Sequence, residues 1–192
     1  DTNFYINKNK NSKLVETFQY NKNKSQLTNL DFNERKLILF GYPKNNINYF
    51  RGGHGLYSTA EDFITFSNML LTGKDKKGNF LLSKKNLGMM TSNIVKKSLF
   101  PLEIISANSI KDTDYENDLD GYGWGLGFRV LMNNSNINKL GTIGEFGWSG
   151  YAATYFLVDP VKNFSAVLMM QILDADSKIK KDFYNNIYKN FS

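Results

Sequence analysis

A strict alternation of glycine with bulky side chains between positions 121 and 130 constrains the fold more than any other feature of the sequence. Large residues stand at every second position, and glycine fills most of the places between them. The large residues are Tyr122, Trp124, Leu126, Phe128 and Val130. A period of two places successive side chains on opposite faces of a β-strand. The pattern therefore predicts one strand with a bulky face and a nearly bare face, which another backbone or a ligand can approach closely.

Three further strands are expected from short apolar runs that end at turn-forming residues. They lie near 142–149, 152–158 and 164–171. Turns are predicted at 133–138 and at 159–163, where asparagine and proline favour a reversal of the chain. Connections this short join antiparallel neighbours, so the four strands are expected to meander through one antiparallel sheet.

Three helices are expected beside this sheet, over 59–72, from after Ser83 to about Thr91, and near 176–189. Ser58 followed by Glu61 matches a capping box at the start of the first helix, and Gly73 can end that helix in a left-handed conformation. The last helix is amphipathic, with apolar residues on one side and lysines on the other. Its two faces are Ile179, Phe183 and Ile187, expected to be buried, and Lys178, Lys181 and Lys189, expected to be exposed.

The predicted fold class is therefore α/β in the broad sense, of the α+β type: an antiparallel sheet flanked by helices that cover it. Residues 1–50 are rich in Asn and Lys and predict an irregular segment with one or two short strands, near apolar groups at 4–6, 14–15 and 37–40. Residues 92–120 predict a polar connection. At 192 residues the chain is long enough for one domain with its own core. It begins without Met and reads as though cut from a longer protein.

Composition narrows the possible partners. An apolar fraction of 41% and an aromatic fraction of 15% indicate a globular protein. The net charge of +6 comes from lysines in short, scattered clusters, whereas nucleic-acid readers concentrate basic charge on one element. We therefore expect no nucleic-acid partner, and no apolar run is long enough to span a membrane. The absence of cysteine excludes disulfides and thiol catalysis, and the cellular compartment stays unknown.

Several common catalytic sites do not fit the sequence. His54 is the only histidine and no G-x-S-x-G elbow accompanies it, so a Ser-His-Asp triad is not predicted. No set of His and carboxylate residues has the spacing of a zinc site. The acidic run at 112–121 lacks the Glu that a calcium loop needs at its twelfth position. We expect neither a metal nor a cofactor.

Two other motifs match by letters alone. The glycines at 121–127 lie inside a predicted strand, whereas a dinucleotide fingerprint needs a strand-to-helix turn. Ser177-x-x-Lys180 has the spacing of a serine nucleophile and its lysine base, but it lies on a basic helix without apolar or glycine-rich surroundings. We interpret this match as accidental.

Two segments carry the functional signal. One is the run Gly-Gly-His-Gly-Leu-Tyr-Ser-Thr-Ala-Glu-Asp at Gly52–Asp62, which leads into the first helix. The other is Gly-Glu-Phe-Gly-Trp-Ser-Gly-Tyr at Gly144–Tyr151, followed by the strand end at 155–160. From its residues alone, the second segment is a strand with glycines where a neighbouring backbone comes close.

Taken in order, these segments resemble the C-terminal half of the β-lactamase-related serine hydrolases, which include class C β-lactamases, D-alanyl-D-alanine peptidases and related esterases. The resemblance extends to Asp1-Thr2-x-Phe4, to Leu81-Leu82-Ser83 and to Gly121–Gly127. It covers essentially the whole chain. It implies that residues 1–192 are the C-terminal part of a single hydrolase domain with a DD-peptidase/β-lactamase-like fold.

The resemblance also implies an acyl-enzyme mechanism. The family's attacking Ser and its Lys, in Ser-x-x-Lys, and its Tyr-x-Asn loop would lie upstream of position 1. Trp148-Ser149-Gly150 corresponds to the third family element, a strand triplet at the edge of the site. The main-chain N–H of Tyr151 would then be one of two donors to the oxyanion, and Gly150 would let the acyl group lie along the strand. This chain alone is expected to be inactive.

Trp148 departs from the Lys or His of the β-lactamase and peptidase branches, which helps to hold a substrate carboxylate. An uncharged ring here resembles the esterase branch and favours a small ester over a carboxylate-bearing amide. By the same resemblance, His54 would lie on the wall of the site. Two alternatives stay open: a β-lactamase or D-alanyl-D-alanine carboxypeptidase, and a non-catalytic binding relative. The expected partners are a small-molecule ester or amide and the N-terminal part of the same protein.

Overall fold

The computed structural model describes residues 1–6, 8–29, 50, 52–53, 55–100, 102, 119, 121–133 and 141–190. Three features predicted from the sequence lie outside these residues. They are the apolar group at 37–40, most of the turn at 133–138, and His54. Most of the polar connection at 92–120 lies outside them as well.

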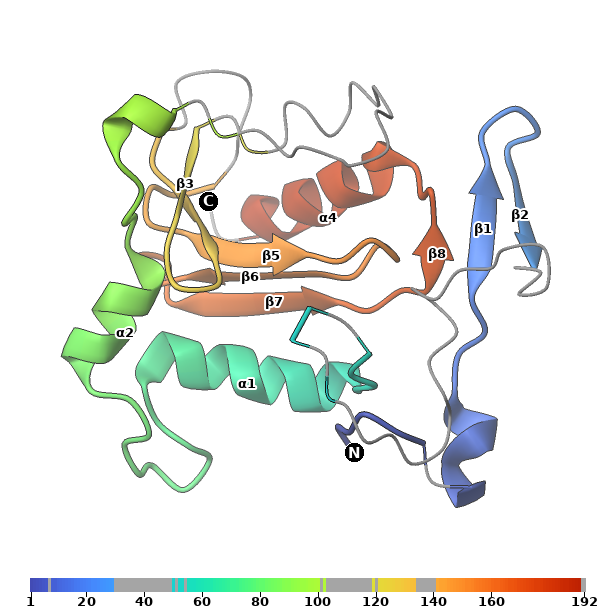
Figure 1. Ribbon diagram of the computed structural model, residues 1–192, viewed down its shortest axis with the longest axis horizontal. Helices are drawn as coiled ribbons and strands as arrows, with labels where there is room; N and C mark the ends of the chain where they lie inside the picture. Colours follow the sequence, from blue (N-terminus) through green and yellow to red (C-terminus); the bar gives the residue numbers. More distant parts are fainter. Residues whose placement is uncertain are drawn as a thin grey trace.

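Five strands form the main sheet, in the spatial order β3-β4-β5-β6-β7 (Figure 1). They are β3 (Tyr122–Trp124), β4 (Arg129–Leu131), β5 (Phe146–Ser149), β6 (Tyr155–Asp159) and β7 (Phe164–Leu168). Each strand pairs antiparallel with the next along the chain. The predicted class, an antiparallel sheet flanked by helices, is confirmed.

The prediction of one continuous strand over 122–130 is wrong, because these residues form a hairpin of β3 and β4. Gly125 donates its N–H to the carbonyl of Phe128 at 2.8 Å, and Gly127 takes a φ of +96°, which favours glycine. The main chain at the end of α2 packs closely against the glycine side of the hairpin, since a Cβ on Gly125 would lie 2.1 Å from the carbonyl oxygen of Met90. The alternating glycines therefore serve a tight turn and a close approach.

The other predicted strands have the right order but begin too early. Residues 142–145 form a turn closed by the Glu145 N–H and the Thr142 carbonyl at 2.8 Å, so β5 begins at Phe146. Residues 150–153 form the turn before β6. The strand predicted over 164–171 ends at Leu168, because the chain leaves the sheet there for a second, smaller one.

This smaller sheet joins the two ends of the described chain. It has the order β2-β1-β8, with β1 (Phe18–Asn21), β2 (Gln26–Asn29) and β8 (Ile172–Leu173). β1 runs antiparallel to β2 and parallel to β8. One or two short strands were expected in the first fifty residues, but β1 and β2 do not coincide with the apolar groups that suggested them. A 3-10 helix over Lys8–Lys13 precedes them.

The three predicted helices are confirmed as α1 (Ala60–Thr72), α2 (Lys84–Thr91) and α4 (Ser177–Lys189); a short 3-10 helix spans Lys97–Leu99. The predicted capping box is wrong by one residue. Thr59 is the N-cap of α1, and its hydroxyl accepts the N–H of Asp62 at 3.1 Å. The Ser58 hydroxyl instead shares a hydrogen bond with Thr2 at 2.8 Å. Gly73 ends α1 with a φ of +75°, as predicted.

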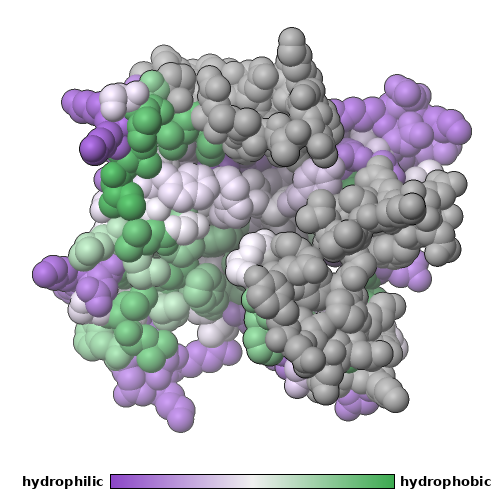
Figure 2. All heavy atoms as spheres, in the orientation of Figure 1, coloured by the Kyte–Doolittle hydropathy of each residue, from purple (hydrophilic) through white to green (hydrophobic). Residues whose placement is uncertain are grey.

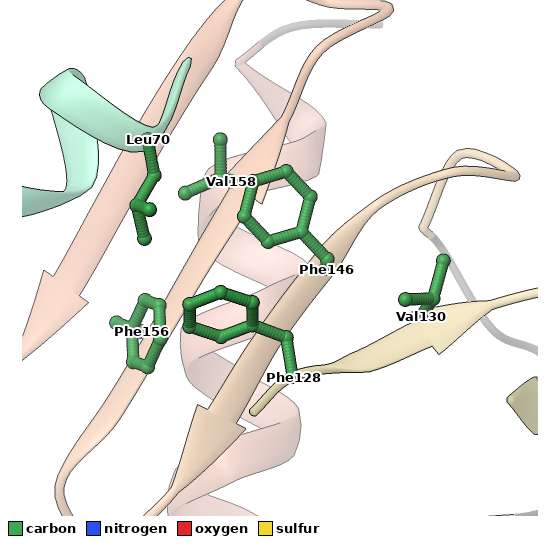
Figure 3. Close-up of a cluster of buried hydrophobic side chains, with 6 residues drawn as sticks. All are labelled: Leu70, Phe128, Val130, Phe146, Phe156 and Val158. Atoms are coloured by element: carbon green, nitrogen blue, oxygen red, sulfur yellow. The ribbon is translucent and has the colours of Figure 1, made fainter. Parts of the chain in front are cut away.

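Helices α1 and α4 lie on opposite faces of the main sheet (Figure 1). On the α1 face, a cluster of buried apolar side chains fills the space between helix and strands (Figure 3). Its members are Leu70, Phe128, Val130, Phe146, Phe156 and Val158. On the α4 face, Leu157 and Phe164 pack against Tyr188, with Phe183 and Ile187 beside them. The three lysines predicted to be exposed on α4 are exposed.

One side of the molecule carries exposed apolar side chains over α2 and the segment that follows it (Figure 2). They are Met89, Ile94, Leu99, Phe100 and Leu126. The N–H of Ile94 donates to the Trp124 carbonyl, and that of Leu126 to the Met90 carbonyl, both at 2.9 Å. These bonds join the end of α2 to the β3–β4 hairpin.

Candidate functional site

The second half of β5 has one paired edge and one open edge. β6 pairs with all four residues of β5, from Phe146 to Ser149. β4 pairs only with Phe146 and Gly147. On the side away from β6, the edge of the sheet is therefore open at Trp148 and Ser149, as far as the described residues show. An open strand edge presents main-chain groups that can bind an extended ligand.

The direction of the main chain at this edge follows from the pairing. Gly150 donates its N–H to the Thr154 carbonyl at 2.7 Å, across the turn to β6. In an antiparallel pair, successive residues direct their N–H and C=O to alternate sides. Because Gly150 is directed toward β6, the main-chain groups of Ser149 point to the open edge.

A cavity of about 400 Å³ lies at the same end of β5. Trp148, Ser149 and Gly150 all contribute to its lining, so three of the predicted site residues meet there. Tyr151 does not belong to the described lining. The other apolar walls from the sheet and α1 include Phe63, Phe156, Val167, Met169 and Met170.

The N-terminal segment and the start of α1 close the other side of this cavity, with Ile6, Leu14, Tyr57, Ser58 and Thr59. Asn3 and Tyr57 exchange main-chain hydrogen bonds of 3.0 and 2.8 Å, which hold the segment against the loop before α1. The two segments singled out in the sequence, Gly52–Asp62 and Gly144–Tyr151, thus border one cavity. His54 lies outside the described residues, so its predicted place on the wall stays a prediction.

Trp148 is held in place by other aromatic rings. Its ring meets that of Trp124 edge to face, with centroids 4.7 Å apart. The N–H of Trp124 in turn donates to the side-chain oxygen of Asn93 at 3.0 Å. A Cβ on Gly123 would lie 2.5 Å from that oxygen, so glycine there admits the Asn93 side chain. The strand with the bare face therefore positions the ring at the mouth of the site.

Tyr151 lies in the turn directly after β5, outside the strand pairing. Its ring is half exposed and its hydroxyl donates to Asp174 at 3.1 Å. The presence of glycine at position 150 also has a local structural explanation, because a Cβ on Gly150 would lie 2.1 Å from the Thr154 hydroxyl oxygen. The expected role of Gly150 toward an acyl group is therefore not needed to explain why glycine stands at this position.

A family model described as Beta-lactamase matches residues 2–188. The chain belongs to the β-lactamase family. No curated protein sequence matches it. Among solved structures, a mutant (LovD6) of simvastatin synthase (LovD) from Aspergillus terreus is similar, with a TM-score of 0.72 and 14% identity over 100% of this chain and 47% of the other. EstCE1, described as a hydrolase with promiscuous acyltransferase activity, is also similar. Its TM-score is 0.72 and its identity 17%, over 97% of this chain and 46% of the EstCE1 chain.

Selenomethionyl LovD without ligand gives a TM-score of 0.70 at 14% identity. At these identities the similarity shows the fold. This β-lactamase-family chain spans less than half the length of the solved structures that it matches. The described helices include none long and apolar enough to cross a membrane. Within the described part of the chain, no cluster of His, Asp and Glu could hold a metal ion.

A second concentration of ionisable groups in this family member lies under α4, at the opposite end of β5 and β6 from the cavity. Arg129, Glu145 and Asp159 are each at most 1% exposed. The Tyr188 hydroxyl lies 2.5 Å from a Glu145 oxygen and 3.0 Å from an Asp159 oxygen. Arg129 donates to the Tyr184 hydroxyl at 2.7 Å, and that hydroxyl donates to Glu145 at 3.2 Å. We call these five residues the polar cluster.

Burial is the main electrostatic influence within the polar cluster. It raises the pKa of Glu145, against the opposing effects of the Tyr188 hydrogen bond and the Arg129 charge. Burial likewise raises the pKa of both Tyr184 and Tyr188, so their hydroxyls stay protonated as donors. No described cavity reaches these groups, and the cluster therefore joins α4 to the sheet.

Sequence reasoning missed the polar cluster and part of the cavity wall. Tyr184 and Tyr188 are four residues apart, which places them on one face of a helix, and that spacing was a usable signal. Val167 and Met169 are two residues apart in the strand predicted over 164–171, a spacing that favours one face. The contribution of the N-terminal segment to the wall has no comparable local signal.

Proposed function

We propose that this chain forms the wall and one oxyanion donor of a serine hydrolase that works through an acyl-enzyme and prefers small esters. One observation supports it above the others: in a β-lactamase-family chain, the open edge of β5 at Trp148 and Ser149 borders an apolar cavity. The attacking Ser, with its Lys and Tyr, would come from the N-terminal part of the same protein. Residues 1–192 would then be the C-terminal part of a single catalytic domain.

The proposed reaction has two steps. The Ser oxygen attacks the ester carbonyl, the bond to the alcohol breaks, and the Ser proton leaves with the alcohol. Water then attacks the acyl–serine ester, releasing the carboxylic acid and restoring Ser. In both steps the carbonyl oxygen becomes negative and needs two fixed N–H donors at about 3 Å. The N–H of Tyr151, in the turn that follows the open edge, would be one donor, and that of the nucleophile the other.

The preference for esters rests on Trp148. Its ring is apolar apart from one N–H donor and packs against Trp124 at the cavity, so position 148 itself supplies no cation to bind a carboxylate. EstCE1, similar in fold, is described as a hydrolase with acyltransferase activity. A carboxylate-bearing lactam or peptide substrate would leave its charge beside an indole ring, which is unfavourable.

The test compares this chain with the same chain joined to its N-terminal part, using p-nitrophenyl esters. We expect turnover only from the joined protein, and Trp148→Lys in that protein should lower ester turnover while raising cephalosporin hydrolysis. Trp148→Phe, which keeps an uncharged aromatic ring at the same position, is the matched control. Ester turnover by the 192-residue chain that disappears in Ser177→Ala would overturn the proposal. An N-terminal part without Ser-x-x-Lys would indicate a binding relative instead.

A further inference from the structure

We propose that the cavity beside Trp148 binds the aliphatic chain of the acyl group and selects unbranched chains of medium length. This inference rests on the proposed function, because it places the acyl carbonyl at the open edge of β5. The aliphatic chain of the acyl group would extend from the carbonyl over Trp148 and then along the α1 face of the sheet, toward Val167 and Met169.

On the side of the sheet and α1, the lining of the cavity is largely apolar. Phe156 is 9% exposed, and Phe63 and Val167 pack against the same buried cluster. The floor therefore continues the hydrophobic core of the α1 face. The Met169 and Met170 side chains, also in the lining, are unbranched and adapt to a ligand. A wall of this kind removes methylene groups from water and offers no fixed partner to a polar group.

Several polar residues of the lining lie on the side formed by the N-terminal segment and the start of α1. Lys10 and Lys13 belong to the 3-10 helix, and Lys13 is exposed. Lys10 forms an ion pair with Asp1. Ser58 and Thr59 are engaged at the start of α1, with Thr2 and Asp62. One side of the lining thus carries charged and hydroxyl groups and the sheet side is largely apolar, so the ligand that fits has one polar end and one apolar end.

An acyl chain suits this cavity better than the alcohol part of an ester. The acyl group stays bound through both steps of the proposed reaction, whereas the alcohol leaves after the first. Burial of the acyl chain therefore stabilises both transition states. Burial of the alcohol would stabilise only the first step and would slow product release.

The volume of the cavity limits the length of the acyl chain that it can hold. At about 30 Å³ for each water-sized group, a cavity of about 400 Å³ holds on the order of ten such groups. Part of this space is the open entrance, so we expect the best acyl group to have roughly six to ten carbons. Each buried methylene contributes about 0.8 kcal/mol, or about a fourfold gain in affinity. The gain should stop when the cavity is full.

The first experiment measures binding and needs no catalysis. Neutral 2-alkanones of five to eleven carbons are titrated into the 192-residue chain carrying Trp124→Phe, and the fluorescence of Trp148 is followed. We expect Kd to fall about fourfold per methylene and then to become constant. Val167→Phe should move this limit to chains shorter by two or three carbons, and Met169→Ala should move it to longer ones. Val161→Phe, at an exposed turn position, is the matched control.

Circular dichroism spectra identify any variant that fails to fold, and the two cavity variants shift the limit in opposite directions, so either one suffices. A Kd independent of chain length, or equal shifts from Val161→Phe and Val167→Phe, would contradict the proposal. The second experiment varies the acyl and the alcohol chains of ester substrates separately in the joined protein. A length limit that appears only on the alcohol side would reject the acyl assignment. If the 2-alkanones bind with the expected limit in chain length but the joined protein does not hydrolyse esters, the proposed function is rejected while the binding pocket is supported.

Discussion

The two faces of the main sheet are stabilised in different ways. On the α1 face, aromatic and aliphatic side chains pack without a buried charge, and the same surface continues into the cavity beside Trp148. On the α4 face, one cation and two carboxyl groups are buried together and joined by two tyrosine hydroxyls. The first arrangement depends on volume and shape. The second depends on every polar group keeping its partner.

The two arrangements also lie at opposite ends of the central strands β5 and β6. Glu145 immediately precedes β5 and Asp159 ends β6, so the polar cluster fixes the ends of these strands that lie away from the cavity. At the other end, β5 leaves β4 and continues toward Tyr151 with one edge open. The end held by the polar cluster thus lies opposite the end with the open edge. The following predictions test whether volume and partners act separately on the two faces.

The largest effect is expected on the α1 face. Phe146 is 1% exposed and packs against Phe128, with ring centroids 5.5 Å apart. Phe146→Ala leaves a cavity in this core and should lower the free energy of unfolding by about 4 kcal/mol. Phe146→Leu keeps most of the volume and should cost about 1 kcal/mol. Urea denaturation followed by circular dichroism measures both, and equal losses would show that volume does not govern this face.

A slightly smaller loss is expected on the α4 face from a change that keeps volume and removes charge. Arg129→Met should lower the free energy of unfolding by about 3 kcal/mol, because Glu145 stays buried without a neighbouring cation. The Tyr184 hydroxyl also loses its donor. The same denaturation experiment provides the measurement.

Adding Glu145→Leu to Arg129→Met supplies the control. The double variant should lose less stability than the sum of the two single variants, since neither charge then remains unpaired. Strict additivity would mean that the two side chains do not act as a unit, and the contrast between the faces would fail.

The pH dependence of stability should come from the polar cluster rather than from the α1 face. The folded pKa of Glu145 is raised above its ordinary value of 4.5, mainly by burial. Above pH 4.5 the folded state therefore holds a proton that the unfolded state has lost, and stability falls as the pH rises. The fall continues until Glu145 ionises in the folded state. Its slope is at most about 1.4 kcal/mol per pH unit for one proton.

The measurement is the difference in unfolding free energy between the wild type and Glu145→Gln, followed upward from pH 4. The wild type should lose stability relative to the variant over this window. A difference that grows in favour of the wild type would mean that the folded pKa of Glu145 is lowered. Asp182→Asn, at an exposed position on α4, should leave the difference flat.

The sequence predicted those features that depend on local patterns. The bounds of α1, α2 and α4 agree within a residue or two, because apolar periodicity, an N-cap hydroxyl and Gly73 all act over one or two turns of the chain. The strand triplet Trp148-Ser149-Gly150 was placed at the edge of a site by resemblance, and the structure brings it to a cavity together with the start of α1.

What could not be predicted depends on contacts between distant segments. The hairpin at 122–131 was predicted to be one strand, because its turn contains no usual turn-forming residue other than glycine. The parallel pair of β1 with β8 joins residues more than 150 positions apart, and no local pattern specifies such a pair. The polar cluster likewise draws its members from β4, the turn before β5, β6 and α4, so its partners come together only in the folded chain.

The smallest expected effect concerns the start of α1, at the edge of the cavity. Thr59→Ala removes the hydroxyl that accepts the Asp62 N–H and should cost about 1 kcal/mol. Ser58→Ala removes exposed hydrogen bonds to the Thr2 hydroxyl and to the Thr59 carbonyl and should cost less than half as much. Urea midpoints of the two variants separate them, with Ser83→Ala, the N-cap of α2, as a comparison for the size of a cap. If Ser58→Ala proved the costlier change, Ser58 and not Thr59 would cap this helix, and the capping box expected from the sequence would be restored.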